Sequence, residues 1–430
     1  MSLSRRLALL GTLLVASGNS LATDPQQVAN RLIEQLQAGR FQQAETGFSD
    51  AMAKAVPAAA LEQVWQSLGQ QLGPLQQVGQ ATLTPMDAHH HRISQRLQFA
   101  RGAVQASTVI DGEGRIAGFQ LTPATAPAAV VPADASFSET ALQVAAGPGP
   151  LGATLSLPKG PGPFPAVVLV HGSGPQDRDE TVGPNKPFAD LAHGLASAGI
   201  AVLRYDKRSQ ARPQDFADGA SLALETTNDA IAAVALLKAQ PGIDPDKVHV
   251  LGHSQGAMVA SRIASASNAA GVVMLASPAR PILDLLREQN VYLLAHSPGV
   301  DATAAQAHLQ QLDAQIAALR SDPAAQLPQL PGLTGAYWQE LEAVDVLGQT
   351  RASGLPTLLL QGGRDFQVID TDWNLLTTGL QGERFTFHHY PALNHLGIAG
   401  EGPGTLAEYQ QPGQVDTGLI NDIAHWILAR

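Results

Sequence analysis

The strongest chemical signal in the chain is a serine placed between two glycines. Residues 252–256 read Gly-His-Ser-Gln-Gly, so Ser254 stands at the centre of a G-x-S-x-G motif. An apolar run at 248–251 precedes the motif and a helix-forming run at 257–264 follows it, which predicts a sharp turn from a buried strand into a helix. Because a serine hydroxyl needs a base to take its proton, Ser254 is a candidate nucleophile whose partners should follow it in the chain.

An acid and a base do follow Ser254, in the chain order that this kind of turn uses. Asp365 stands in a Gly-Gly-Arg-Asp turn directly after the predicted strand 357–361. His395 lies in the loop after the predicted strand 384–390. Together the three residues would form a Ser-His-Asp triad, in which the histidine accepts the hydroxyl proton and the carboxylate orients the imidazole.

Other acids and histidines near these positions fit less well. Asp370 and Asp372 have the pattern of caps for a following helix. His388 and His389 fall within a predicted strand, where sheet packing fixes the side chains. His253 adjoins the serine but is expected to face away. The acid and the base assigned above are therefore preferred.

A fourth segment could stabilise negative charge on a reacting carbonyl. The apolar run 168–170 leads into His-Gly-Ser-Gly at 171–174. In this context the backbone N–H groups of Ser173 and Gln255 are expected to form an oxyanion hole. Each such donor stabilises the transition state by about 3 kcal/mol.

Two further patterns resemble ligand sites but are better explained as turns. Residues 147–152 match G-x-G-x-x-G, yet they contain two prolines and precede no helix, so a dinucleotide site is not predicted. His89, His90 and His91 form a histidine run without a further ligand at metal-binding spacing. We therefore expect no cofactor and no metal.

The elements that must position these residues alternate between strand and helix. Beyond residue 133 the sequence predicts short buried strands separated by helices, which is typical of a mostly parallel sheet covered on both faces. The predicted strands are 166–170, 200–205, 248–252, 270–275, 357–361 and 384–390, and the predicted helices are 187–198, 222–239, 255–266 and 415–428. The serine, the acid and the base all follow ends of these strands.

Residues 280–353 interrupt this alternation with helical sequence rich in Ala, Gln and Leu. We expect an inserted helical cap, because the segment is too long for a bare loop. Its apolar residues exceed what one buried stripe needs, so some should face a substrate pocket. Tyr337 and Trp338 are the bulky candidates for this role. The alternative is that both aromatic side chains anchor the cap to the sheet.

The N-terminal part has its own organisation. Residues 23–121 predict helices followed by strands, with a hairpin turn at 111–114, and so a small α+β domain. Residues 122–132 are rich in Ala and Pro and predict a linker. The domain with the candidate site then covers residues 133–430.

Residues 1–22 have the pattern of a secretory signal peptide. Arg5 and Arg6 precede an apolar stretch at 7–16, and a Ser-Leu-Ala sequence ends at Ala22. The stretch is too short to span about 30 Å of hydrocarbon, so no stable membrane anchor is expected. We predict export to the periplasm or the medium and cleavage near Ala22, by the general secretory route rather than the twin-arginine route.

Composition limits the possible functions. The 430 residues are 44% hydrophobic and 15% charged, which allows a large core. The chain has no cysteine, so disulfides, thiolate catalysis and cysteine-bound zinc are excluded. A formal net charge of −11 argues against a nucleic-acid partner. Composition does not predict an oligomeric state.

Several blocks of this sequence together resemble one group of bacterial α/β-hydrolases, the EstD-type serine carboxylesterases. The blocks are residues 171–180, 183–188, 200–208, 252–256, 361–365 and 393–396. The resemblance spans residues 133–430, and members often carry a small N-terminal domain of unassigned role, which residues 24–121 resemble.

The resemblance implies an α/β-hydrolase fold and carboxylic-ester hydrolysis with Ser254, Asp365 and His395 as the triad. Gln255 departs from the leucine often found there, but the oxyanion hole needs only its backbone N–H. The charged loop at 177–180 matches the group as well, and we expect it to form a salt-bridged frame near the pocket.

The sequence therefore predicts a serine hydrolase that cleaves small-molecule esters with short- to medium-chain acyl groups. An aminopeptidase or an acyl thioesterase would use the same triad, and these alternatives stay open. A non-catalytic binding protein of this fold would be expected to lack part of the triad or the oxyanion loop, and every part is present.

Overall fold

The computed structural model describes residues 24–87, 89–100, 102–124, 129–296, 301–326 and 333–430. Its chain divides into two units, Met1–Thr125 and Ala126–Arg430. The predicted signal peptide at 1–22 lies outside the described residues. Among the described helices, none has both the length and the apolar character that a membrane crossing requires.

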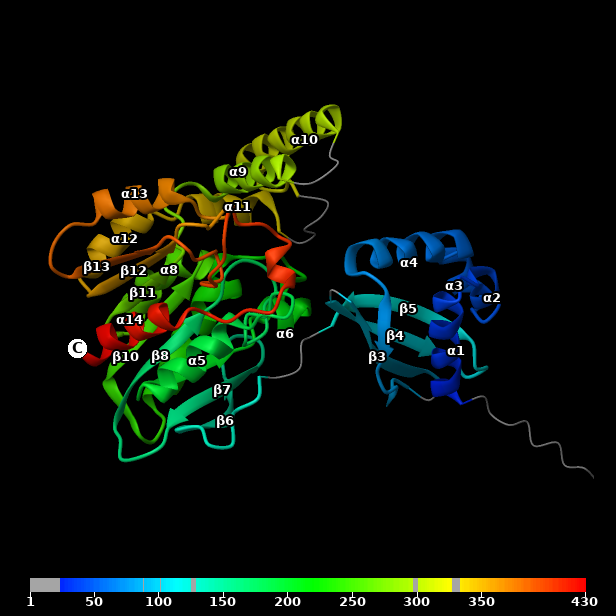
Figure 1. Cartoon of the computed structure of the whole chain (residues 1–430), viewed down its shortest axis with the longest axis horizontal. Coiled ribbons are helices and arrows are strands. Elements are labelled where there is room, and N and C mark those ends of the chain that lie inside the picture. Colours follow the sequence, from blue (N-terminus) through cyan, green and yellow to red (C-terminus); the bar gives the residue numbers. More distant parts are fainter. Residues whose placement is uncertain (1–23, 88, 101, 125–128, 297–300, 327–332) are drawn as a thin grey trace, which may run out of the picture. The chain divides into compact units, whose positions relative to one another are not determined.

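The first unit packs helices against an antiparallel sheet (Figure 1). Helix α1 (Pro25–Gln37) buries one face, on which Leu32 and Leu36 lie four residues apart. Buried and part-exposed residues alternate along β3 (His91–Phe99), as expected for a strand with one covered face. The other elements are α2 (Phe41–Glu45), α3 (Asp50–Ala55), α4 (Ala58–Leu72), β1 (Leu75–Val78), β2 (Thr82–Pro85), β4 (Gly102–Ile110) and β5 (Ile116–Pro123).

The second unit is built on a sheet with the strand order β13-β12-β11-β10-β8-β9-β7-β6. Neighbouring strands run parallel from β13 to β9, whereas β7 is antiparallel to both β9 and β6. The bounds are β6 (Phe137–Val144), β7 (Leu151–Pro158), β8 (Phe164–Val170), β9 (Ala201–Tyr205), β10 (Ile243–His253), β11 (Val272–Leu275), β12 (Thr357–Gly362) and β13 (Phe385–Tyr390). The predicted mostly parallel sheet is confirmed.

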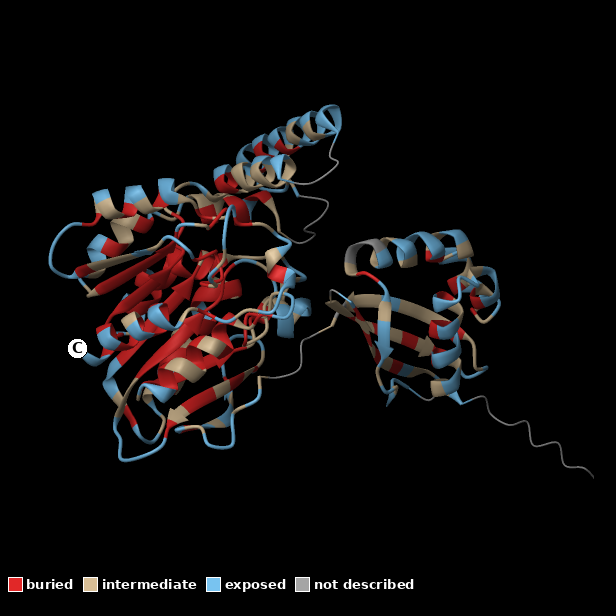
Figure 2. Ribbon diagram, in the orientation of Figure 1, coloured by how far each residue is buried: buried red, intermediate tan, exposed pale blue. Residues whose placement is uncertain are grey.

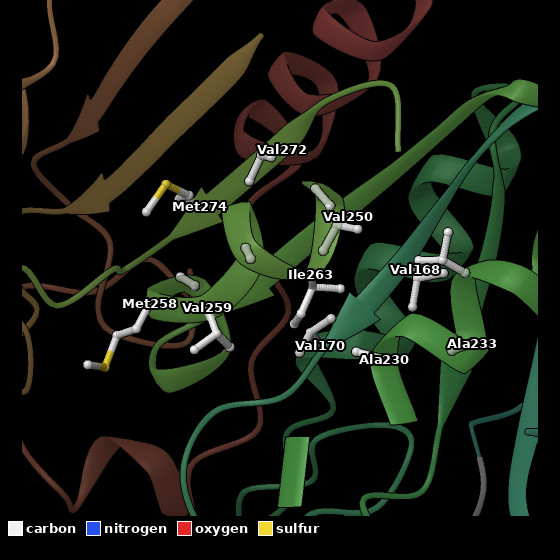
Figure 3. Packing of buried hydrophobic residues seen from close by; sticks show 14 of the residues in the cluster. Val168, Val170, Ala230, Ala233, Val250, Met258, Val259, Ile263, Val272 and Met274 are labelled. Atoms are coloured by element: carbon white, nitrogen blue, oxygen red, sulfur yellow. The ribbon is translucent and has the colours of Figure 1, made fainter. Parts of the chain in front are cut away.

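Helices cover both faces of this sheet. Residues of α7 (Asn228–Lys238) and α8 (Gln255–Ala266) pack on one face, and those of α5 (Pro187–Ser197) and α14 (Thr417–Leu428) pack on the other. Figure 2 shows that the buried residues concentrate in the central strands. In Figure 3, Ile263 of α8 lies among the valines of those strands. Strands buried on both faces explain the continuous apolar runs in the sequence.

The segment between β11 and β12, predicted as a helical insertion, is helical. Its elements are α9 (Ile282–Ala295), α10 (Ala302–Ser321), α11 (Gly335–Glu342) and α12 (Val346–Ser353). Shorter or later elements of this unit are α6 (Arg208–Ala211), η1 (Pro213–Phe216), the π-helical turn η2 (Ala223–Thr227), α13 (Asp370–Gly379) and η3 (Glu408–Gln410).

Asp372 anchors the start of this insertion. Its Oδ1 accepts the backbone N–H groups of Ala279 and Arg280, at 2.9 and 3.0 Å. Its Oδ2 accepts the guanidinium of Arg280, and the Asp372 side chain is fully buried. The expectation that Asp372 caps the following helix is wrong, because the carboxylate binds the backbone N–H groups of Arg280 and Ala279, 92 and 93 residues away.

Three predicted turn or linker segments can be located. Residues 147–152 contain the turn of the β6–β7 hairpin and the start of β7. His89 and His90 lie in the turn before β3 and His91 is the first residue of β3, while His90 pairs with Asp87. Thr122, expected in the linker, instead pairs with Gln105 as part of β5.

A buried histidine in the core predicts acid sensitivity. His249 on β10 is buried against Trp426, and burial lowers its pKa to about 4. The unfolded chain, with a histidine pKa of about 6.5, binds this proton more tightly. Between these two pKa values the free energy of unfolding should therefore fall as the pH drops. Above about pH 6.5 the neutral His249 side chain makes its full contribution to stability.

His249→Gln should flatten that dependence by up to about 1.4 kcal/mol per pH unit. The measurement is the melting temperature of parent and variant at about pH 7 and about pH 5. A variant that loses stability between the two pH values as steeply as the parent would contradict the assignment.

Candidate active site

Ser254 lies in a strained turn between β10 and α8, called the elbow below (residues 252–256). Its backbone φ is +54° and its ψ is −120°, a region that residues with a side chain rarely occupy. A Cβ on Gly252 would lie 2.4 Å from the carbonyl oxygen of Gly256, so only glycine fits this turn. The backbone N–H of Ser254 donates to the carbonyl of Leu275 at 2.9 Å, which holds the turn against β11.

The elbow packs directly against the loop that follows β8. A Cβ on Gly256 would lie 2.3 Å from the carbonyl oxygen of Val170 and 2.5 Å from that of His171. A Cβ on Gly172 would lie 3.2 Å from the Cβ of Ser254. The predicted oxyanion loop and the predicted nucleophile are therefore neighbours in space.

The predicted acid and base meet at the same edge of the sheet. His395 Nδ1 lies 2.7 Å from Asp365 Oδ2, and both residues are buried. The other carboxylate oxygen, Oδ1, accepts the backbone N–H groups of Gln367 and Val368 at 2.8 and 2.9 Å. Because an ionised carboxylate only accepts hydrogen bonds, Nδ1 of His395 carries the proton and Nε2 remains the basic nitrogen.

The elbow contacts the His395 loop through His253. Nε2 of His253 lies 2.9 Å from the backbone oxygen of His395, and the centres of the two rings are 4.7 Å apart. The expectation that His253 faces away is therefore wrong. Within the described ranges no hydrogen bond joins the Ser254 hydroxyl to His395. Catalytic hydrogen bonds of this kind often shorten only when substrate binds.

Glu180 links the predicted oxyanion loop to the elbow. Its Oε1 accepts the Gly172 N–H at 2.7 Å, and its Oε2 lies 2.9 Å from Nδ1 of His253 in ion-pair rather than aligned hydrogen-bond geometry. Burial is the largest single influence and opposes the charged form of His253, but the charge and side chain of Glu180, together with the His395 carbonyl and the Asp365 charge, raise the His253 pKa. Burial likewise opposes the charge on Glu180, and His253 holds the pKa of Glu180 below its usual value. The two side chains therefore form a buried ion pair.

A second buried ion pair binds the carbonyl group of Gly172. Lys207 Nζ donates to the Gly172 carbonyl oxygen at 2.7 Å and lies 2.8 Å from Glu225 Oε1. The other oxygen of Glu225 accepts the Gln255 side-chain amide at 3.0 Å and the Tyr337 hydroxyl. The Lys207 and Glu225 side chains are only 2% and 4% exposed.

The two predicted oxyanion donors lie beside this network. Ser173 follows Gly172 and is exposed, and Gln255 is the first residue of α8, where helix geometry provides no acceptor for the N–H. In the part of the chain that the structure describes, neither backbone N–H has an acceptor. Both are therefore available to a developing negative charge, and the N-terminus of α8 favours such a charge.

The predicted pocket residues Tyr337 and Trp338 on α11 are both buried, at 2% and 8% exposure. They pack edge to face with their ring centres 5.8 Å apart, within the hydrophobic cluster that joins the cap helices to the sheet. This is what the anchoring alternative predicts. The Tyr337 hydroxyl also donates to Glu225, a contact that hydropathy did not suggest.

The less favoured acids and histidines lie elsewhere. His389 pairs with Asp370 at 2.8 Å, and His388 lies 3.3 Å from Asp422. No group of three or more histidine, aspartate or glutamate side chains among the described residues could hold a metal ion.

Sequence reasoning missed the charged residues around Gly172. The loop at 177–180 does contain the expected salt bridges, such as Arg178 to Asp206 at 2.6 Å, but Glu180 turns inward to the site. Lys207 and Glu225 received no role. Lys207 stands two residues after a strand that is buried throughout. A lysine buried at such a position needs a partner of opposite charge, so this position was a usable signal for a buried ion pair.

The Asp365–His395 contact can be tested apart from any activity. In Asp365→Asn the backbone N–H groups of Gln367 and Val368 should bind the amide oxygen, so the new NH₂ group faces His395. Nδ1 must then accept, and the proton moves to Nε2. The parent should have a low-field proton NMR resonance for the His395 Nδ1–H, and the variant should lack it. Asp370→Asn, beside His389, should retain it, and a resonance that survives Asp365→Asn would contradict the contact.

Comparisons with known proteins identify the family to which this chain belongs. The family described as "Alpha/beta hydrolase family" matches residues 167–408, and "Protein of unknown function (DUF3887)" matches residues 29–119. Esterase EstD of Thermotoga maritima is 36% identical over 411 residues, which cover 94% of this chain and 95% of that protein.

The solved structure of Est1E from Butyrivibrio proteoclasticus is 17% identical, with a TM-score of 0.46, over 67% of this chain and 99% of its own. A second solved structure, that of an esterase domain from Rhodothermus marinus, is 17% identical, with a TM-score of 0.42, over 67% of this chain and 97% of its own. The chain belongs to the alpha/beta hydrolase family.

Proposed function

We propose that this hydrolase cleaves carboxylic esters of small molecules through an acyl-enzyme intermediate on Ser254. The observation that carries the proposal is the buried Asp365–His395 pair at 2.7 Å, beside an elbow serine with φ of +54°. The similarity to the Thermotoga maritima esterase supports ester bonds over other acyl bonds, because it extends over 94% of this chain.

In the acylation step, Ser254 Oγ attacks the ester carbonyl carbon while Nε2 of His395 takes the hydroxyl proton. Asp365 holds the other ring nitrogen and stabilises the imidazolium that forms. The N–H groups of Ser173 and Gln255 donate to the carbonyl oxygen as it becomes negative. The tetrahedral intermediate then collapses, the C–O bond to the alcohol breaks, and His395 gives its proton to the departing alcohol.

In the deacylation step, water repeats the same sequence. His395 takes a proton from water, and the hydroxide attacks the acyl carbonyl of the Ser254 ester. Collapse breaks the bond to Ser254 Oγ, which recovers its proton from His395, and the carboxylic acid leaves. We propose short- to medium-chain acyl groups as substrates, and a series of p-nitrophenyl esters from acetate to laurate would establish the preferred length.

Ser254→Ala should lower kcat for p-nitrophenyl acetate by about 10,000-fold or more, because triad members act as a unit. Melting temperature and circular dichroism should stay close to those of the parent, since the change removes one partly exposed hydroxyl. A fluorophosphonate probe should label the parent at Ser254 and leave the variant unlabelled. Labelling at another serine, or retained turnover in a folded variant, would refute the nucleophile.

Parallel assays separate the reaction classes that share this triad. The parent should hydrolyse p-nitrophenyl acetate faster, by kcat/KM, than an aminoacyl p-nitroanilide or an acyl thioester. A higher kcat/KM for the anilide would indicate an aminopeptidase, and a higher value for the thioester would indicate a thioesterase. Absence of turnover and of probe labelling would indicate a binding protein.

We also propose that the protein is exported, on the basis of the N-terminal sequence pattern. Protein recovered from the periplasm or the medium of an expressing cell should begin at Thr23 on N-terminal sequencing. Full-length protein confined to the cytoplasmic fraction would contradict export.

A further inference from the structure

We propose that Lys207 and Glu225 are positioning residues of the oxyanion hole, an inference that rests on the ester hydrolysis proposed above. Neither side chain would touch substrate. Lys207 would set the direction of the Ser173 N–H, and Glu225 would fix the Gln255 residue that supplies the second N–H.

The peptide bond between Gly172 and Ser173 links Lys207 to the first proposed oxyanion donor. A trans peptide is planar, and its C=O and N–H point in opposite directions. Lys207 Nζ holds the Gly172 oxygen at 2.7 Å, so the same contact determines where the Ser173 N–H points. Glu180 Oε1 holds the Gly172 N–H at 2.7 Å, and this glycine is therefore fixed at both of its backbone polar groups.

The positive charge of Lys207 should also strengthen the Ser173 N–H as a hydrogen-bond donor. A cation at the carbonyl oxygen draws electron density along the peptide, and hydrogen bonds in such a chain strengthen one another. The Ser173 N–H should therefore be a better donor to an oxyanion than an ordinary backbone N–H. The environment preserves this effect, because the Lys207 side chain is 2% exposed and little water competes for its charge.

The same ion pair also contacts the elbow. Glu225 contacts Lys207 through Oε1 and the Gln255 side chain through Oε2. The Gln255 amide also donates to the Tyr337 hydroxyl at 3.1 Å. With its side chain held in this way, the first residue of α8 has little freedom to rotate its backbone N–H. Glu225 lies on the π-helical turn η2, a rare conformation that is frequent at functional sites.

The charged form of Glu225 fits this role. Burial disfavours its charged form, but Lys207 and the hydrogen bonds from Tyr337 and Gln255 keep its pKa below the usual value. A buried ion pair is weak evidence for stabilisation, because desolvation of two charges offsets most of their attraction. The pair instead contacts the Gly172 carbonyl, which shares a peptide group with the Ser173 N–H, and the Gln255 side chain, and these contacts indicate a role in the reaction.

The test compares Lys207→Met with a matched control, Arg208→Met. Arg208 is the next residue and is also a buried cation, but it pairs with Asp215 and Asp229 and has no contact with the oxyanion loop or the elbow among the described residues. Lys207→Met should lower kcat for p-nitrophenyl acetate by about 10- to 100-fold, with KM changed by less than about threefold. Arg208→Met should lower the melting temperature but keep kcat within about twofold, when both are assayed well below their melting temperatures.

Rescue separates charge from packing. The chain has no cysteine, so the single thiol of Lys207→Cys can be alkylated in denaturant with 2-bromoethylamine, which restores an ammonium at nearly the lysine length. After refolding beside identically treated parent, the alkylated variant should regain at least about a third of the lost kcat, whereas alkylation with iodoacetamide should not. If Lys207→Met fails to fold, Glu225→Gln should still lower kcat severalfold, because its one amide oxygen can accept from Gln255 and Tyr337 while its NH₂ group cannot accept from Lys207.

The outcomes distinguish this inference from the proposed function. An active parent whose kcat is unchanged in Lys207→Met, or falls no further than in Arg208→Met, would overturn the positioning role alone. Equal recovery with 2-bromoethylamine and iodoacetamide would do the same. A parent that neither hydrolyses esters nor reacts with the fluorophosphonate probe would overturn the proposed function and this inference with it.

Discussion

The site depends on how closely the elbow backbone approaches the loop after β8. Gly256 lies so near the carbonyl oxygens of Val170 and His171 that a single Cβ would be within 2.5 Å of both. This contact fixes Ser254 relative to the proposed oxyanion loop without any side-chain adjustment. Because both segments leave neighbouring parallel strands, β10 and β8, the sheet register determines the distance between the proposed nucleophile and the proposed oxyanion donors.

Around this backbone contact, the charges are buried in compensated pairs. Glu180 with His253 and Lys207 with Glu225 each place one partner on the Gly172 residue. An unpaired charge in such a place would be strongly destabilising, whereas the pairs are satisfied and add hydrogen bonds to backbone groups. The result is a preorganised polar environment at the position where the proposed reaction develops negative charge, with little reorganisation needed during the reaction.

Local sequence patterns were sufficient for the parts of this architecture that depend on local chemistry. Continuous apolar runs identified the central strands, since those strands are buried on both faces, and the glycine spacing identified the turn at Ser254. The proximity of Asp365 to His395 followed from chain order, because loops at the same ends of parallel strands meet at one edge. The contacts of Lys207 could not be predicted, because Gly172 is 35 residues away and no periodic pattern relates the two. The prediction that Asp372 caps a helix was wrong for the same reason, because its backbone partners, Ala279 and Arg280, are also distant in sequence.

The cap aromatics illustrate a different limit. Hydropathy gave Tyr337 and Trp338 a large apolar surface, but it carries no information about the direction of one hydroxyl group. That hydroxyl contacts Glu225 and the amide of Gln255, at a motif position where only the backbone N–H seemed to matter. The placement of α11 and the orientation of the first turn of α8 are consequently fixed by the same hydrogen bonds. A shift of the cap helix large enough to break them would also release the residue that supplies one of the proposed oxyanion donors.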